Sequence, residues 1–432
     1  MEAHALEPRW GQPVTGIVSL IVISVVTWII WYIFSDPRGP VHSFPYPFLL
    51  YIGGMIIVGL WQHVSFGHWP FQGLSQPFRG IVETVVNLVL VWLLIHVIFY
   101  KILGAGFNFL SEPNLEALAA AGKTVMPAGF GQTLTYDALI NPNFRFGERA
   151  VVCFVLIGFF SYAFHAVLFA KWPIYPSNLQ QPQAGLCELG WCTMLTVFFY
   201  SALIVPFWGL IFDVVFGKSY GLNTPWWGGI AGTSHVDWVV GWWQWMIVVL
   251  FMAPNVWRMK PWTGIKLPQP WKGCISFISV VIISYALAVI CMRIAPLWLN
   301  MTEVIQHLPP ADAGNPTRFL WHHAADIAIF GLLPPIVWSH FFDDMVPMAN
   351  KDSWGAFWFR TVGVVLLMAV GYLFYYVINW GHWGLGIHHM AGSMSERVLD
   401  GEAIIWNVWW VIPFLWNEWF FEKWPFYVHA DH

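Results

Sequence analysis

The sequence predicts an all-α, polytopic membrane protein with about ten transmembrane helices, arranged as five repeated helical hairpins. Of the 432 residues, 58% are hydrophobic and only 10% are charged, whereas soluble domains carry about 25% charged residues. So few charged side chains cannot cover a surface that faces water on all sides, but they suit one that faces a lipid bilayer. The net charge of −4 offers no basic surface for nucleic acid.

Ten apolar runs approach the length of about 20 residues that a helix needs to cross about 30 Å of hydrocarbon. They lie at approximately 14–34, 44–62, 80–103, 149–170, 185–216, 236–256, 273–294, 319–341, 355–379 and 402–421. The segment 104–148 is expected to be an extramembrane loop. An even number of spans places both termini on one side. The Lys and Arg residues of loop 257–272 favour the cytoplasm, and we expect a prokaryotic-type inner or plasma membrane.

A short motif, Gln-Pro-x-x-Gly, recurs at the start of the odd-numbered runs. Its copies are Gln12–Gly16, Gln76–Gly80, Gln181–Gly185 and Gln269–Gly273, with a degraded form at Asp352–Ala356. Proline suits a helix start because its missing N–H would have no intrahelical partner there. A Trp–Pro element follows the even-numbered runs, at His68–Phe71, Lys171–Ile174 and Lys423–Phe426, with a variant at Lys260–Trp262.

These elements predict one membrane domain over residues 1–432, built from hairpins that all run the same way. Their approximate bounds are 12–70, 76–173, 181–262, 269–347 and 352–426. A parallel repeat of this kind differs from the inverted repeat of many secondary transporters.

Polar residues inside the runs are the candidate functional residues, because an ionisable group costs at least about 2.5–3.5 kcal/mol to insert at the helix centre. Seven residues before the Trp of the Trp–Pro element, or its equivalent, stand Gln62, His165, Asn255, His340 and Asn417. Three residues after the glycine of the first motif, or its equivalent, stand Ser19, Glu83, Glu188, Ser276 and Trp358. At 1.5 Å per residue, both positions lie about 5–10 Å inside the same face.

If the hairpins pack in a ring, these side chains form a His/carboxylate cluster near the cytoplasmic face. The predicted residues for binding a substrate, proton or ion are His63, Glu83, His165, Glu188, Asn255, His340 and Asn417. A transition metal such as iron or copper would use His63, Glu83, His165, Glu188, His340 and Asp343, since imidazole and carboxylate suit these metals. The alternative is that the polar side chains only join neighbouring helices by hydrogen bonds.

A second candidate group begins the eighth run, with His322, His323 and Asp326. His322 and Asp326 are four residues apart and are therefore expected on one helix face. His340 lies eighteen residues after His322, about 27 Å along a straight helix, so the two groups are separate. His382, His388 and His389 would either join this group or lie in a solvated loop.

The leading functional hypothesis is a transporter or channel for a small solute or ion. The alternative is a membrane-embedded metalloenzyme, an oxidoreductase, or a subunit of a redox complex that uses the same cluster. A third reading is a scaffold that packs partner subunits, an oligomer or lipids. The sequence contains no GxxxxGK[ST] phosphate loop and no HExxH motif, so it offers no sign of the nucleotide or zinc-protease chemistry that these motifs support.

Overall fold

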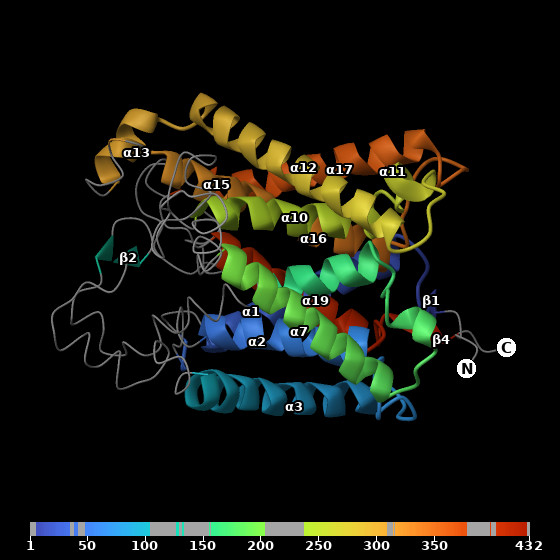
Figure 1. Cartoon of the computed structure of the whole chain (residues 1–432). Helices are drawn as coiled ribbons and strands as arrows, with labels where there is room; N and C mark the ends of the chain where they lie inside the picture. Colours follow the sequence, from blue (N-terminus) through green and yellow to red (C-terminus); the bar gives the residue numbers. More distant parts are fainter. Residues whose placement is uncertain are drawn as a thin grey trace.

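The computed structural model describes residues 6–34, 39–41, 48–103, 127–128, 132–133, 155, 157–203, 237–308, 314, 316–377, 398 and 403–429. Most of the predicted loop 104–148, and His382, His388 and His389, lie outside this part of the chain. The termini pair with each other, since β1 (Leu6–Pro8) is antiparallel to β4 (Tyr427–His429). A second short pair joins β2 (Pro127–Ala128) and β3 (Gln132–Thr133). The termini, β1 and β4 lie at one end of the molecule, hereafter the terminal end, and α13 (Met301–His307) lies at the other (Figure 1).

Five helical segments in the described residues are long and apolar enough to cross a membrane, which supports the predicted class of protein. They are Val14–Phe34, Phe78–Phe99, Trp271–Leu297, Thr317–Phe341 and Trp354–Val377. These segments contain α1 (Val14–Phe34), α3 (Phe78–Trp92) with η2 (Leu93–Leu103), α12 (Trp271–Ile294) with η5 (Ala295–Leu297), α15 (Thr317–Ile329) with α16 (Leu333–Ile336) and η6 (Val337–Phe341), and α17 (Trp354–Tyr372) with η7 (Leu373–Val377).

The other five predicted runs coincide with helices that are shorter or less apolar. These are α2 (Phe48–Leu60) with η1 (Trp61–Ser65), the helix Ile157–Val167, α7 (Gln183–Leu203), α10 (Asp237–Asn255) and α19 (Ala403–Trp419). Short η4 (Tyr175–Ser177) and α11 (Lys260–Thr263) lie in the connections. The structure therefore supports a membrane protein, whereas the count of about ten spans goes beyond it.

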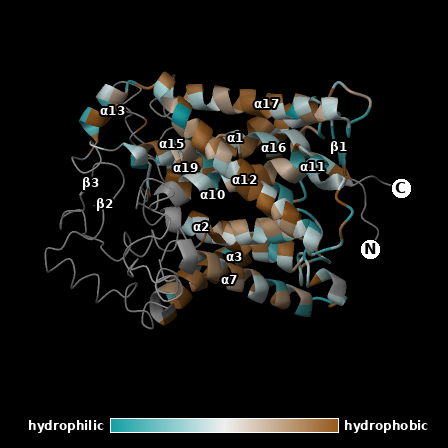
Figure 2. Ribbon diagram, turned by 45° about the horizontal axis from the view of Figure 1, so that its top comes forward, coloured by the Kyte–Doolittle hydropathy of each residue, from teal (hydrophilic) through white to brown (hydrophobic). Residues whose placement is uncertain are grey.

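The helices form two layers. Exposed large apolar side chains occur on α1, α3, α7, α12 and α17, and none of the described side chains of α2, α10, α15 or α19 belongs to this exposed set. The ribbon is accordingly coloured as hydrophobic along much of α12 and α17 (Figure 2). An outward-facing apolar surface of this extent suits contact with lipid.

The inner layer is a closed ring of helices. α10 packs on α15, α15 on α19 and α19 on α2. α2 touches the helix Ile157–Val167 at Gly158, and this helix meets α10 where the rings of Phe160 and Trp243 lie 4.1 Å apart. Gly241 allows the closest approach, because a Cβ there would stand 2.4 Å from the carbonyl oxygen of Trp321.

Each inner helix ends in the same backbone turn. Two successive residues have positive φ, and the N–H of the second donates to the carbonyl six residues earlier. The pairs are Gly67–His68, Ala170–Lys171, Arg258–Met259, Asp343–Asp344 and Glu422–Lys423, and the acceptors are Gln62, His165, Ala253, Trp338 and Asn417.

These turns correct the predicted alignment of the inner helices. Ala253 and Trp338, rather than Asn255 and His340, stand level with Gln62, His165 and Asn417. For Asn255, the error arose because Trp262 was matched to the Trp of the Trp–Pro elements, whereas the turn matches Pro261 to their proline. A polar residue therefore does not recur at this level in all five helices.

The Gln-Pro-x-x-Gly motif joins an outer helix to the end of an inner helix. The amide of each glutamine donates to a carbonyl oxygen there, over 2.8–2.9 Å: Gln12 to Phe341, Gln76 to Phe420, Gln181 to Ser65 and Gln269 to Leu168. The motif glycine faces the ring of the next residue, which is Phe342, Phe421, Phe66 or Phe169. The motif is thus a helix–helix joint, and these joints set the level of the polar side chains described next.

Candidate functional site

A line of acid and imidazole groups starts at the buried carboxylate of Glu83, whose side chain is 1% exposed. His68 Nδ1 lies 3.0 and 3.2 Å from the two carboxylate oxygens of Glu83. His68 Nε2 lies 3.1 Å from His63 Nδ1. His68 therefore bridges an acid and a second imidazole, one through each ring nitrogen.

Neighbouring amides and an aromatic ring hold this line in place. Gln62 donates to the backbone carbonyl of Glu83 (3.0 Å) and accepts from Asn87 (2.9 Å). The imidazole of His63 stacks on the indole of Trp419 with centroids 5.5 Å apart and an interplanar angle of 13°. The rings are thus fixed in orientation by contacts from three helices.

A second acid–imidazole pair includes Glu418, the residue that precedes Trp419. Glu418 Oε1 lies 2.5 Å from His340 Nδ1, and His340 Nε2 donates to Asn255 Oδ1 over 2.9 Å. Glu418 also interacts electrostatically with His63. We call the set Glu83, His68, His63, Glu418, His340 and Asn255 the His–Glu line.

Glu188 and His165 belong to a separate group. Lys171 Nζ lies 3.3 Å from Glu188 Oε2, and His165 Nε2 lies 3.8 Å from Glu188 Oε1, beyond hydrogen-bond distance. Lys171 also donates to the backbone carbonyl of Val64. A cavity of about 440 Å³ opens beside this group and includes Ser65 in its lining.

Two of the predicted residues, Asp343 and Asn417, make structural hydrogen bonds at the terminal end. Asp343 accepts from the amide of Gln12 (2.7 Å) and from the hydroxyl of Tyr427 (2.8 Å). Burial, together with the hydrogen bond and the negative charge of Asp343, raises the pKa of Tyr427 well above its usual range. Asn417 donates to the carbonyl of Trp424 (2.7 Å), within its own helix-end turn.

The six residues predicted as metal ligands are divided among these groups. Glu83, Glu188, His340 and Asp343 each have different partners. Within the described residues, no group of three or more His, Cys, Asp or Glu side chains is arranged to hold a metal ion.

In the second candidate group, the neighbour of Asp326 is His323, with Nδ1 and Oδ2 3.6 Å apart. His323 and Asp326 are both fully buried, whereas His322, which was expected on the same helix face as Asp326, is half-buried.

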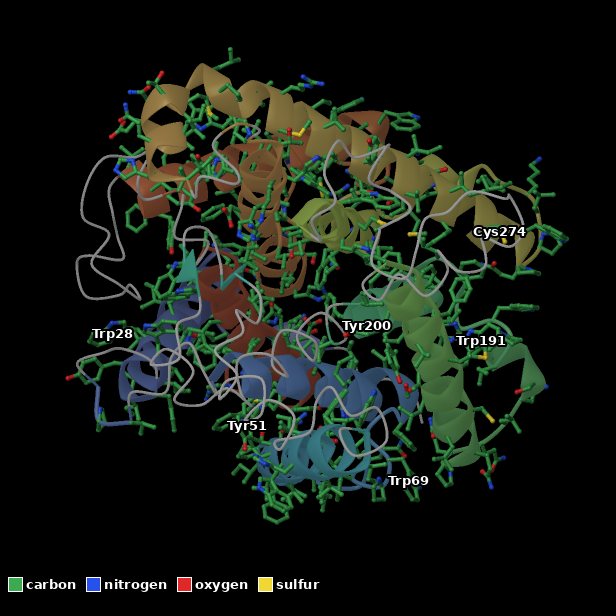
Figure 3. The ribbon with its side chains drawn as sticks, turned by 60° about the vertical axis from the view of Figure 1, so that its left-hand side comes forward. Trp28, Tyr51, Trp69, Trp191, Tyr200 and Cys274 are labelled. Atoms are coloured by element: carbon green, nitrogen blue, oxygen red, sulfur yellow. The ribbon has the colours of Figure 1, made fainter. Side chains whose placement is uncertain are left out.

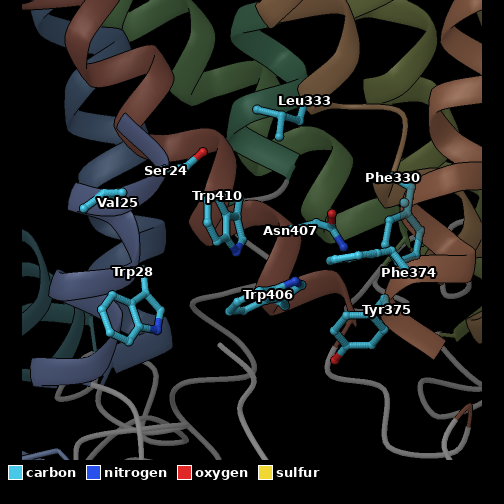
Figure 4. Close-up of a pocket in the computed structure, with 11 residues that line it drawn as sticks. Ser24, Val25, Trp28, Phe330, Leu333, Phe374, Tyr375, Trp406, Asn407 and Trp410 are labelled. Atoms are coloured by element: carbon cyan, nitrogen blue, oxygen red, sulfur yellow. The ribbon is translucent and has the colours of Figure 1, made fainter. Parts of the chain in front are cut away.

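An aromatic cavity of about 670 Å³ lies among α1, α17 and α19. Trp28, Trp406, Trp410 and Phe374 stand around it (Figure 4). Its lining has no carboxylate, imidazole or cationic side chain. The cavity therefore suits an apolar group rather than the acid–base chemistry of the His–Glu line.

Sequence reasoning missed three residues of these groups as site residues: His68, Lys171 and Glu418. His68 and Lys171 appeared only as the first residues of Trp–Pro elements, and Glu418 was not named as a site residue. It also overlooked a pair formed by Tyr51 and His96. The hydroxyl oxygen of Tyr51 (labelled in Figure 3) lies 2.6 Å from Nε2 of His96. Such pairs join different helices, so spacing along the chain carries little signal for them.

Comparisons with protein-family models, with curated proteins and with solved structures find no match to this chain.

Proposed function

We propose that this protein is a multi-pass membrane transporter or channel that moves a small solute or ion, and that the His–Glu line carries protons in this process. The observation that supports it best is the unbroken hydrogen-bonded series Glu83–His68–His63. Imidazole suits this role because it titrates near neutral pH and has two distinct nitrogens. An ionisable side chain inside a membrane is also expensive and is by default a functional residue.

The series can relay a proton from His63 to Glu83 for one choice of histidine tautomers. When His68 Nδ1–H donates to Glu83, His68 Nε2 accepts the N–H of His63, and His63 Nε2 is left as the proton acceptor. A proton arriving at His63 Nε2 lets the Nδ1 proton of His63 pass to His68. The Nδ1 proton of His68 then passes to Glu83. One proton enters at His63 and one is gained by the carboxylate.

We further propose the finer architecture of ten spans in five parallel hairpins, with both termini in the cytoplasm. Its support is the recurrence of one turn at five helix ends and of one glutamine–glycine joint at four outer helices. In this arrangement the inner ring holds the second helix of every hairpin. The His–Glu line then crosses the bundle near the cytoplasmic ends of these helices.

Proton movement in proteoliposomes tests the proposal. With a pH gradient and a pH-sensitive dye inside the vesicles, Glu83→Gln and His68→Gln should each slow proton movement by about 100-fold, the lower range of the effect of a positioned acid–base group. Glu303→Gln, which removes a carboxylate from α13 at the opposite end, is the matched control and should behave as the wild type. Wild-type rates in both line variants would remove these residues from the mechanism.

Metal analysis of the purified protein addresses the metalloenzyme alternative. That alternative gains no supporting geometry within the residues described. Stoichiometric iron or copper that is lost in His165→Ala would favour it over transport.

A further inference from the structure

Asp326 is a buried carboxyl group in the middle of α15. Its side chain is 0% exposed, and neither carboxylate oxygen has a hydrogen-bond partner among the described residues. Nδ1 of His323 lies 3.6 Å from Oδ2 of Asp326, which is too far for a hydrogen bond. None of the transport steps proposed above uses this group.

His323 is held from its other side by a short hydrogen-bonded chain. The hydroxyl of Tyr372 lies 2.9 Å from His323 Nε2, and Trp298 Nε1 donates to the same hydroxyl oxygen over 3.0 Å. Indole N–H is a donor only, so the tyrosine oxygen accepts from Trp298 and its own proton is directed to His323 Nε2. The ring proton of a neutral His323 then resides on Nδ1, on the side of Asp326.

The surroundings of the pair are apolar and aromatic. The ring of Phe319 stacks on His323 with centroids 5.6 Å apart, and the ring of Tyr376 lies 6.0 Å from it. Between Trp238 and Asn255, α10 contributes no ionisable side chain, and neither do η5 or residues 403–417 of α19. Ionisable groups on α15 and on the described elements around it include Arg318, His322, Tyr285, Cys291, Arg293, Tyr372, Tyr375 and Tyr376, and of these Tyr372 interacts electrostatically with Asp326.

An ionised Asp326 would be poorly compensated here. A carboxylate removed from water loses several kcal/mol of hydration, and only good hydrogen bonds or a close counter-charge restore it. Asp326 has at most one distant N–H facing it. The neutral carboxylic acid avoids most of this cost.

We propose that Asp326 binds a proton, and that Asp326, His323 and Tyr372 form a second proton-binding site, separate from the His–Glu line. Asp326 lies fourteen residues before His340 in the sequence, about 21 Å at the standard helical rise. The site therefore stands deep in the inner ring, toward the end opposite the termini. It does not depend on the function proposed above.

The infrared spectrum of the purified protein in lipid nanodiscs tests this site, because a protonated carboxylic acid has a carbonyl band that a carboxylate lacks. The spectrum at neutral pH should contain such a band, and Asp326→Asn should remove it. Glu303→Gln, which changes a half-buried carboxyl group on α13, should leave the band in place. Identical carbonyl regions in the wild type and Asp326→Asn would overturn the proposal.

Two further measurements keep the test independent of the folding of Asp326→Asn. Tyr372→Phe keeps Asp326 but removes the donor to His323, so the band should shift in frequency. An unshifted band would exclude Tyr372 from the site. Addition of sodium or potassium chloride at constant pH should leave the band unchanged, and its loss would assign the site to an alkali cation instead of a proton.

Discussion

His68 is the second residue of a positive-φ turn, with φ of 67°, where most side chains are disfavoured. Histidine is among the residues that tolerate this region better than most. Lys171 and Asp344 occupy the same position in their own turns. Each of the three residues pairs with an ionisable side chain on the following outer helix: His68 with Glu83, Lys171 with Glu188 and Asp344 with Arg360. One backbone position thus supplies three different polar pairs.

For the Lys171–Glu188 pair, we expect loss of the lysine to destabilise the protein more than loss of the carboxylate. Lys171→Met leaves the carboxylate of Glu188, which is 4% exposed, without its cation. Removing one partner of a buried pair costs roughly 3–5 kcal/mol, because the remaining charge is uncompensated. Lys171→Met should therefore lower the Tm in detergent more than Glu188→Gln, which leaves a half-exposed lysine. Equal losses of Tm in the two variants would contradict this account.

The identity of the polar groups was only partly accessible from the sequence. Of the polar residues that the sequence singled out, Glu83, His165 and Glu188 are buried and His340 is half-buried. Their partners were not predicted, because His68, Lys171 and Glu418 are brought to them by the turn and by packing between helices. The sequence also offered no means of distinguishing His322 from His323 as the neighbour of Asp326, since both spacings place side chains on a shared face.

At the scale of the helices, the motif glycines determine how closely an outer helix meets an inner one. A Cβ on Gly80 would stand 2.5 Å from the ring of Phe421, whereas a Cβ on Gly190 of α7 would meet nothing within 4 Å. Both glycines lie in helices, where alanine is intrinsically favoured by about 1 kcal/mol. Alanine substitutions at the two positions therefore distinguish the effect of helix packing from that of intrinsic helix propensity.

Gly80→Ala should lower the Tm, since the clash forces α3 away from the end of α19. Gly190→Ala should leave the Tm unchanged or raise it. Thermal unfolding of the two variants, followed by intrinsic tryptophan fluorescence, provides the comparison. A Gly80→Ala protein as stable as Gly190→Ala would mean that the joint adapts freely.

The helices themselves were the most predictable part of the fold. Five of the apolar runs coincide with helices that are long and apolar enough to cross a membrane, because the length needed to cross a bilayer is a strong constraint. The register between helices was less accessible, as Asn255 and His340 illustrate. Their level depends on where the positive-φ turn begins, and Lys260–Trp262 lacks the Trp–Pro order that marks it elsewhere.

At the scale of the whole molecule, the two chain ends are joined to each other and to η6. β1 pairs with β4, and Asp343 accepts hydrogen bonds from Gln12 near one terminus and Tyr427 near the other. The spatial order of the helices that results was not available from the repeat, because similar motifs do not specify which helix end each one meets.

Tyr427→Phe tests the importance of this closure. The change leaves Asp343 with one hydrogen-bond donor fewer and should destabilise the protein by about 1–3 kcal/mol, the cost of an unsatisfied buried polar group. Hydrogen exchange of β1 and β4 should rise together in the variant. Faster exchange in β4 alone would show that the two termini are held independently.

The joints of Gln12 and Gln76 are made with Phe341 and Phe420, which lie 329 and 344 positions further along the chain. During biosynthesis, the first helices are therefore inserted long before the ribosome has made the surfaces that receive them. The side-chain amides of Gln12 and Gln76 therefore lack these carbonyl partners until Phe341 and Phe420 have been made. These two joints can thus form only after residues 341 and 420 have been synthesised.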